Sequence, residues 1–423
     1  MIVTLAVVAL YPADAMFGQR TSADDIASVR TSVAPASIRG ACLNGDQFNG
    51  EWGGVDSAGR LLIEKGAYFT GDALSSIALD ALMRIEFEGS VETNADEHIL
   101  FLNDGSALHG LLQGTDVDAV RFDSVLGQGT SIALDEAAAI RWGRPLPNDP
   151  AFALFKSWKG KRRAGQDMLI TYGAEPKALP GRLVSLTDDG GTFEFGGKSR
   201  RFVMGKTFGI VMAQGLTAAG RPPASCVLSN GTTIAGSLEA SPASACHLRT
   251  TWGGTVKLSA EELRRIEIRS DRLVYLSTLE PLRVETRGVV HDPWPIQKDQ
   301  SVSRSPISLD GIVYKHGFGV HSFSELVFEL KGGYQTLAGM IGIDDAVRPR
   351  GSVVFRVLGD GRPLFESDVL TGIDPAIPVK IDVSQIDVLQ LIVDWGEGLD
   401  LSDHADWADM RLIRPSGGGD DRT

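Results

Sequence analysis

Alternation of apolar and polar residues in short runs dominates the last third of the chain. Apolar side chains recur at every second position in the runs Leu326–Leu330, Val353–Val357, Val379–Val383 and Leu389–Val393. A two-residue period turns one face of a strand toward a core and the other toward solvent. Since no amphipathic helix of useful length accompanies these runs, they predict a β-sandwich in this part of the chain.

A different pattern repeats along the first two-thirds. Four segments share one plan: an apolar strand, a turn with glycine, a second glycine in the next strand, and a closing isoleucine 35 to 40 residues after the turn. The turn glycines and closing isoleucines are Gly45 and Ile85, Gly105 and Ile140, Gly173 and Ile210, and Gly231 and Ile266. Glycine accepts the positive φ of tight hairpin turns, and inside a strand it marks a bend where a side chain would collide. The pattern predicts small, strongly bent sheets that close on themselves.

Together the two patterns predict an all-β protein. Its repeats resemble small SH3-like or Sm-like β-barrels, and a β-sandwich follows them. The expected β repeats cover residues 38–90, 91–147, 165–214 and 222–270. The sandwich is expected at residues 273–415, and a flexible tail at 416–423.

The N-terminal segment and the cysteines are the features that indicate where in the cell the protein is found. An apolar run at Ile2–Leu10 followed by Ala13-Asp14-Ala15 resembles a secretory signal peptide over residues 1–15 and predicts export. No Lys or Arg precedes the run, so a buried strand is the alternative. No segment approaches the ~20 apolar residues that span a bilayer. Cys226 and Cys246 either pair or remain free thiols, and the absence of C-x-x-C argues against structural zinc.

Composition and charge exclude some partners. With 43% hydrophobic and 22% charged residues the chain is typical of globular proteins. A net charge of −13 argues against nucleic acid and against anionic membrane surfaces. A short basic run at Lys159–Arg163 is either a solvated linker surface or a patch for an acidic partner.

Polar segments rich in glycine, histidine and aspartate interrupt the strands of the last third: Gly311–Ser322, Gly342–Asp345 and Asp403–Asp409. Loops held by a rigid scaffold often carry function. In their order and spacing, these segments and the strands between them closely resemble the NPCBM family over about residues 273–415. The resemblance implies a galactose-binding-like β-sandwich that binds terminal sugars such as galactose in end loops, and it implies no catalysis.

Sugar recognition needs an aromatic face and planar polar groups. The candidate ligand-binding residues are His316, His321, Arg348, Asp394, His404 and Trp407. Trp407 is alternatively a core residue, and His321 alternatively binds loop backbone. Four carboxylates could surround a structural Ca²⁺, namely Asp344, Asp345, Asp403 and Asp406. The alternative for Asp344 and Asp345 is a cap on a turn.

Two enzyme hypotheses are disfavoured. Paired carboxylates could make a glycosidase, but the chain has no catalytic-sized barrel or helical segment. A hydrolase built from Ser322, His321 and Asp403 lacks the G-x-S-x-G nucleophile elbow. We therefore expect an exported, non-catalytic carbohydrate-binding protein whose repeats act as spacer or adaptor. The alternative is a structural or protein-interaction protein of the cell envelope.

Overall fold

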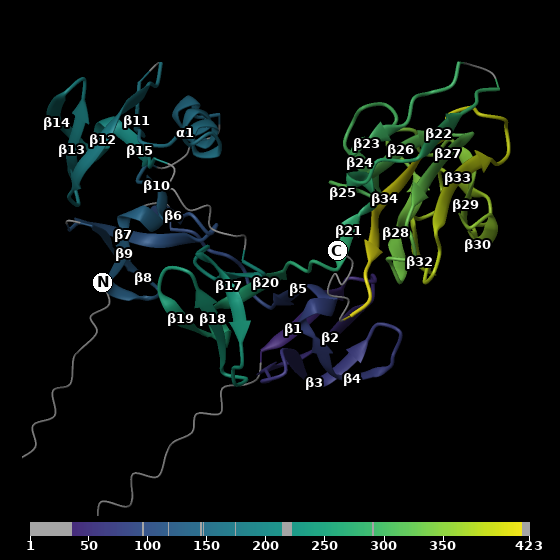
Figure 1. The fold of residues 1–423 in the computed structure, drawn as a ribbon, viewed down its shortest axis with the longest axis horizontal. Helices are drawn as coiled ribbons and strands as arrows, with labels where there is room; N and C mark the ends of the chain where they lie inside the picture. Colours follow the sequence, from purple (N-terminus) through teal and green to yellow (C-terminus); the bar gives the residue numbers. More distant parts are fainter. Residues whose placement is uncertain are drawn as a thin grey trace, which may run out of the picture. The chain divides into compact units, whose positions relative to one another are not determined.

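The computed structural model describes residues 36–416, except 95–96, 117, 144–145, 147, 174, 214–221 and 290–291. The predicted signal peptide, and all of the predicted tail but residue 416, lie outside the described residues. The described residues form an almost entirely β structure, which confirms the predicted fold class. Strands β1 to β20 belong to one hydrogen-bonded network and strands β21 to β34 to a sandwich (Figure 1).

The same succession of elements occurs four times between residues 37 and 268: four strands, a short 3-10 helix, and a fifth strand. In every set the first strand pairs with the second and the fifth, the second with the third, and the third with the fourth. The strands are β1 Ser37–Cys42, β2 Gln47–Val55, β3 Arg60–Tyr68, β4 Ala73–Ala78, β5 Leu82–Phe87; β6 His98–Leu102, β7 Ala107–Thr115, β8 Ala119–Ser124, β9 Gly127–Ala133, β10 Ala137–Arg141; β11 Asp167–Thr171, β12 Ala178–Leu186, β13 Gly190–Phe195, β14 Lys198–Val203, β15 Thr207–Val211; and β16 Ala224–Leu228, β17 Thr233–Glu239, β18 Ala245–Thr250, β19 Gly254–Ser259, β20 Leu263–Ile268. The 3-10 helices are Leu79–Ala81, Leu134–Glu136, Met204–Lys206 and Ala260–Glu262.

The sets do not close into barrels, which corrects that part of the prediction. Among the described strands, the fourth and fifth of a set are not paired with each other; the fifth strands pair across sets instead. Ile85 of β5 lies opposite Ile266 of β20, and Ile140 of β10 lies opposite Ile210 of β15. Because this antiparallel pairing satisfies the free edge of each fifth strand, the closing isoleucines join sheets rather than seal barrels. All four are fully buried in one hydrophobic core.

Glycines inside the second strands permit this tight bending. A Cβ on Gly110 would lie 1.9 Å from the carbonyl oxygen of Asp123, and one on Gly236 would lie 2.4 Å from that of Arg249. Both oxygens belong to the neighbouring strand, so any side chain would push the two strands apart. At the hairpin turns, Gly231 adopts a φ of +88°, which other residues rarely accept.

The helix α1, Pro150–Gly160, lies between the second and third sets and was not predicted from the hydrophobic pattern. Asp149 caps its first turn by accepting a hydrogen bond from the Ala151 N–H at 2.8 Å. Its buried face includes Phe155, whose ring meets that of Phe208 on β15 at 5.6 Å. In the part of the chain that is described, no helix combines the length and the hydropathy that a membrane crossing requires.

The last third folds as two packed six-stranded sheets and a two-stranded hairpin. One sheet has the order β23-β26-β34-β28-β32 with β21 beside β34, and the other β22-β27-β33-β29-β30 with β31 beside β29. The strands are β21 Leu273–Tyr275, β22 Arg283–Thr286, β23 Gln297–Lys298, β24 Ile307–Leu309, β25 Ile312–Tyr314, β26 Gly317–His321, β27 Ser324–Glu329, β28 Thr336–Ile343, β29 Ser352–Gly359, β30 Arg362–Glu366, β31 Leu370–Thr371, β32 Ile377–Asp382, β33 Val388–Trp395 and β34 His404–Ile413; a 3-10 helix covers Leu276–Thr278. The predicted alternating runs become β27, β29, β32 and β33, and their inward residues fill the core between the sheets.

Candidate functional site

One end of the sandwich gathers most of the polar segments that the sequence singled out. Strand β26 ends at His321, β28 ends one residue before Asp344, and β34 begins at His404. These three strands are neighbours, and the register places His321 directly opposite His404. The strand ends therefore bring these three side chains to the same end of one sheet.

An exposed indole covers the two imidazoles. The ring of Trp294, in the loop between β22 and β23, lies parallel to that of His321 with centroids 5.6 Å apart and an interplanar angle of 10°. It also meets the ring of His404 at 5.0 Å. Trp294 is 37% exposed, so part of the indole is open to a ligand. Sequence reasoning missed this residue, although a Trp-Pro pair in a polar loop was a signal for it.

Both histidines have restricted hydrogen bonding. Nδ1 of His321 lies 2.9 Å from the carbonyl oxygen of Ser322, so this nitrogen donates to it. Nδ1 of His404 is enclosed and has no hydrogen-bond partner among the described residues. Burial, and then the charge of His321, lower the pKa of His404, and Asp344 opposes this shift. A neutral imidazole at His404 can accept a hydrogen bond from a hydroxyl group.

Asp403 holds the loops of this end together. Its carboxylate accepts hydrogen bonds from the Ser322 hydroxyl and, at 2.9 Å, from the Ser352 N–H. Burial raises the pKa of Asp403, and these two hydrogen bonds oppose the shift. Both oxygens are thus engaged by the protein itself, and the side chain is only 1% exposed. Its observed contacts position the loops.

Asp345 and Arg348 form a second brace. Asp345 accepts hydrogen bonds from the Ser308 hydroxyl at 2.6 Å and from the Gly311 N–H at 2.8 Å. Arg348 donates to the carbonyl oxygens of Gly372 and Asp374 at 2.8 and 2.9 Å. It also pairs with Asp310, and this hydrogen-bonded pair raises the pKa of Arg348. Most of the bonding capacity of both side chains is used inside the domain.

Three of the four oxygens on two buried carboxyl groups lack donors among the described residues. Asp406 is 0% exposed and neither of its oxygens has a hydrogen-bond partner among the described residues; the same holds for Oδ2 of Asp344, which is 2% exposed. Burial, and then the neighbouring Asp344 carboxyl, raise the pKa of Asp406 well above its usual value. Of the four acids predicted to bind Ca²⁺, these two face each other. The described residues contain no group of three or more His, Cys, Asp or Glu side chains arranged for a metal ion. Calcium stays a prediction.

With this geometry in place, comparison with known families matches residues 272–413 to the NPCBM/NEW2 domain. Residues 272–413 form an NPCBM domain. Alpha-1,3-galactosidase B of Akkermansia muciniphila is 32% identical over 116 residues, which are 26% of this chain and 14% of that protein. The chain spans 9% and 14% of the lengths of the two curated relatives that it matches.

Two solved structures are also similar to part of this chain. The CBM51 module of Clostridium perfringens GH95, solved in complex with methyl-galactose, is 31% identical, covers 33% of this chain and 99% of its own, and has a TM-score of 0.31. The CBM51-2 and INT domains of Clostridium perfringens ZmpB, solved with GlcNAc, are 27% identical, cover 40% of this chain and 36% of their own, and have a TM-score of 0.31.

Three other predicted ligand-binding residues of the NPCBM domain are engaged in contacts within the protein. Trp407 is 0% exposed and packs edge to face on Phe355, with centroids 4.9 Å apart, so it is a core residue. Asp394 forms an ion pair with Arg356 between β33 and β29. His316 precedes β26 and stacks on Tyr275 with centroids 4.0 Å apart.

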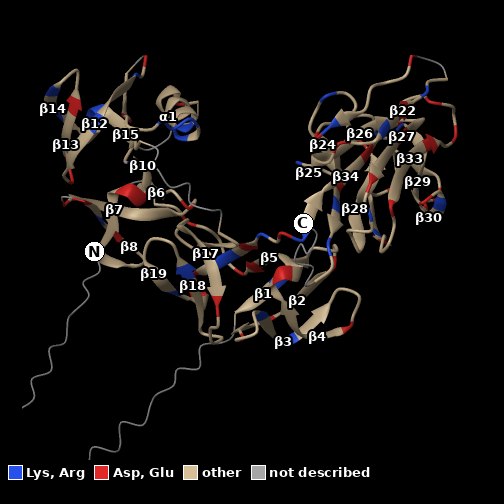
Figure 2. Ribbon diagram, in the orientation of Figure 1, with Lys and Arg blue, Asp and Glu red and all other residues tan. Residues whose placement is uncertain are grey.

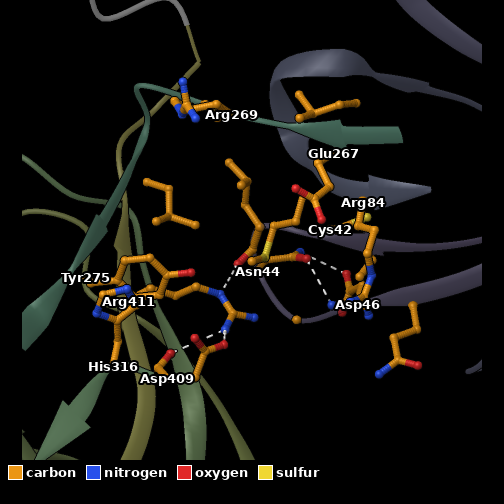
Figure 3. A pocket seen from close by; sticks show the side chains of 18 of the residues that line it. Cys42, Asn44, Asp46, Arg84, Glu267, Arg269, Tyr275, His316, Asp409 and Arg411 are labelled. Atoms are coloured by element: carbon orange, nitrogen blue, oxygen red, sulfur yellow. Dashed lines mark hydrogen bonds and ion pairs between the residues drawn. The ribbon is translucent and has the colours of Figure 1, made fainter. Parts of the chain in front are cut away.

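His316 instead lines a cleft of about 1750 Å³ (Figure 3). Tyr275, Asp409 and Arg411 of the NPCBM domain line this cleft together with residues of the first β set. Arg411 pairs with Asp409 and donates to the Leu43 carbonyl oxygen at 2.7 Å. Lys380 binds Asp46 at 2.8 Å. These charged groups of the cleft are therefore engaged with other parts of the chain.

Proposed function

We propose that the protein binds glycans through the end of the NPCBM domain where Trp294 lies over His321 and His404. The observation that carries this proposal is the exposed indole held parallel to a buried imidazole. A fixed aromatic face suits the apolar side of a pyranose ring, and its rigidity reduces the entropy lost on binding. The His404 ring, whose pKa is lowered, supplies an acceptor for a sugar hydroxyl beside that face.

Galactose-type sugars are the proposed ligand class. The NPCBM match supports carbohydrate as the partner, and the Akkermansia relative is named as a galactosidase. The braces made by Asp403 and Arg348 support the same proposal, because they hold the surrounding loops rigid before any ligand arrives. We further propose export to the periplasm, cell surface or medium, where such glycans occur, with the four β sets acting as a spacer.

A non-catalytic role accords with the contacts of the residues that a hydrolase would need. The Ser322 hydroxyl donates to Asp403 and not to a histidine, and the residue is 1% exposed. The Nδ1 atom of His321 is bonded to the Ser322 carbonyl oxygen. A nucleophilic serine needs an imidazole base within hydrogen-bond reach and access to substrate. Among the described residues the Ser322 hydroxyl bonds to a carboxylate instead of an imidazole, and the residue is almost fully buried.

The test is a titration of the full chain with galactose-terminated oligosaccharides by isothermal calorimetry. Trp294→Ala should weaken binding at least about tenfold, because removing an aromatic anchor costs ~2 kcal/mol or more and 1.4 kcal/mol corresponds to tenfold. Val313→Ala is the matched control, since Val313 is 63% exposed on the separate strand β25. Equal binding by the Trp294→Ala variant, or no binding by the wild-type chain across a broad glycan array, would contradict the proposal.

A further inference from the structure

The helix α1 and the turn after it are basic in an acidic protein. Residues 150–163 contain five basic side chains and no acidic one. The whole chain has a net charge of −13, so the other residues carry −13 − 5 = −18. Figure 2 shows this positive charge on α1. At physiological ionic strength charges are screened over ~8 Å, so the local cations dominate the field at this surface.

Basic side chains of α1 and of the turn after it lie over aromatic rings. Lys156 and Lys159 are three residues apart on α1, as neighbours on one helical face are, and Arg163 lies in the turn after the helix. Each lies over a ring, with distances to the centroid of 4.6 Å for Lys156 over Phe152, 3.8 Å for Lys159 over Phe101 and 5.5 Å for Arg163 over Trp158. The surface therefore presents positive charge and apolar ring area together.

Arg162 fixes the orientation of the turn. Its guanidinium donates to the carbonyl oxygens of Met212 and Ala213 at 3.0 and 2.7 Å, and to Oδ1 of Asn103 at 2.6 Å. These three hydrogen bonds tie the end of α1 to the sheets on which it packs. Lys161 and Arg163, on either side, remain exposed. The exposed cations are thus carried by a rigid support.

In the described part of the chain, the basic residues of α1 and of the turn after it form no ion pair. None of the ion pairs between described residues includes Lys156, Lys159, Lys161, Arg162 or Arg163. Burial lowers the pKa of Arg162, and the nearby Asp167 carboxylate opposes this shift. Burial lowers the pKa of Lys159, which shows that its charge is costly where it lies. The helix dipole favours cations at this end, but it contributes only ~0.3–1 kcal/mol each and acts within the last turn. An external anion would compensate the remaining charge.

We propose that this surface of α1 binds an anionic polysaccharide, one whose sugar rings carry carboxylate or sulfate groups. The exposed cations would pair with the anionic groups, and the half-buried rings of Phe152 and Trp158 would contact the sugar faces. The choice of a glycan polymer, rather than a nucleic acid, rests on the proposed function of the NPCBM domain.

The experiment titrates the full chain with a sulfated heparin oligosaccharide. Binding should weaken roughly 10- to 100-fold between about 50 and about 200 mM salt, as expected when three or four cations release counterions. The triple variant K156Q/K161Q/R163Q should lose at least about tenfold in affinity at the lower salt concentration. The matched control K198Q/R200Q/K206Q removes the same charge from exposed residues of β14 and the turn after it, and should keep wild-type affinity.

Three results would overturn the proposal: no binding of the wild-type chain, equal losses in both triple variants, or tighter binding of an oligothymidylate of the same charge. The last result would assign the surface to nucleic acid.

Testing each variant with the ligand of the other site distinguishes the two proposed sites. Trp294→Ala should leave heparin binding unchanged, and K156Q/K161Q/R163Q should leave the binding of galactose-terminated glycans unchanged, so each proposal fails or stands independently.

Discussion

Replacing Asp406 by asparagine should stabilise the protein at neutral pH. In the wild-type chain three buried carboxylate oxygens, two on Asp406 and Oδ2 of Asp344, have no donor among the described residues. Two such groups cannot both remain ionised without a positive species between them, and the raised pKa of Asp406 favours a proton in that place. An asparagine amide would supply a donor without any protonation step.

The size of the expected stabilisation follows from the hydrogen bond that the asparagine amide would donate to the Asp344 carboxylate. A hydrogen bond to a charged group contributes ~1.5–3 kcal/mol, so Asp406→Asn should raise the free energy of unfolding by about 1–3 kcal/mol near pH 7. For a domain of this size, ~1 kcal/mol corresponds to a rise of about 2–4 °C in Tm.

The pH dependence has a defined sign. Because the pKa of Asp406 is raised, the folded state binds this proton more tightly than the unfolded state. The resulting stabilisation is complete below the unfolded pKa of ~3.9 and is lost as the pH rises through the folded pKa. The Asp406→Asn variant should lack this fall in stability.

Scanning calorimetry of the full chain across this pH range, with chelator and with added calcium, measures both the rise in stability near pH 7 and the change in its pH dependence. Asp345→Asn is the matched control and should destabilise, because that carboxylate already accepts hydrogen bonds from Ser308, Asp310 and Gly311. Our reasoning is refuted if Asp406→Asn lowers Tm while chelator destabilises only the wild-type chain. That result would assign a cation to the Asp344–Asp406 pair.

Three further predictions concern stability. Trp407→Ala should cost about 3–5 kcal/mol of stability, because the indole is fully buried against Phe355; denaturant titration checks this, and a loss below ~1 kcal/mol would contradict the core placement. Gly110→Ala should lower the melting temperature, because its Cβ would lie 1.9 Å from the Asp123 carbonyl oxygen, whereas alanine at the open position Gly205 should not. Ser322→Ala should cost about 1–3 kcal/mol by leaving the buried Asp403 carboxylate one donor short, as seen in thermal melts; an unchanged melting temperature would show that the hydrogen bond contributes nothing.

Local patterns were sufficient for the strands and the family resemblance. The alternating runs around Phe328 and Phe355 predicted strands whose inward residues fill the sandwich core, because the two-residue period of a strand is a local property. The turn glycines and closing isoleucines likewise marked real hairpins and buried strands. Helix α1 was missed because it is short and buries only Ala151 and Phe155, so its sequence carries little helical periodicity.

The candidate site was only partly predictable. His321, Asp344 and His404 end or begin neighbouring strands, so their shared position follows from the strand boundaries. Trp294 comes from a distant loop, and only folding lays its ring on His321. The carboxylates of Asp345 and Asp403 accept hydrogen bonds from residues of other loops. The sequence around these two residues does not distinguish them from the neighbouring aspartates.

The amino-acid order alone thus determined the β character of this chain, its family-like terminal segment and the residues available for a site, since backbone periodicity and turn chemistry act over a few positions. Tertiary structure alone decided that fifth strands pair across sets instead of closing barrels, which carboxylates keep unpaired oxygens, and which aromatic ring stays exposed. Those outcomes depend on contacts between residues far apart in the sequence, such as Ile85 and Ile266, which are 181 positions apart. They also depend on which hydrogen-bond partners reach each buried polar group, and those partners come from distant parts of the chain.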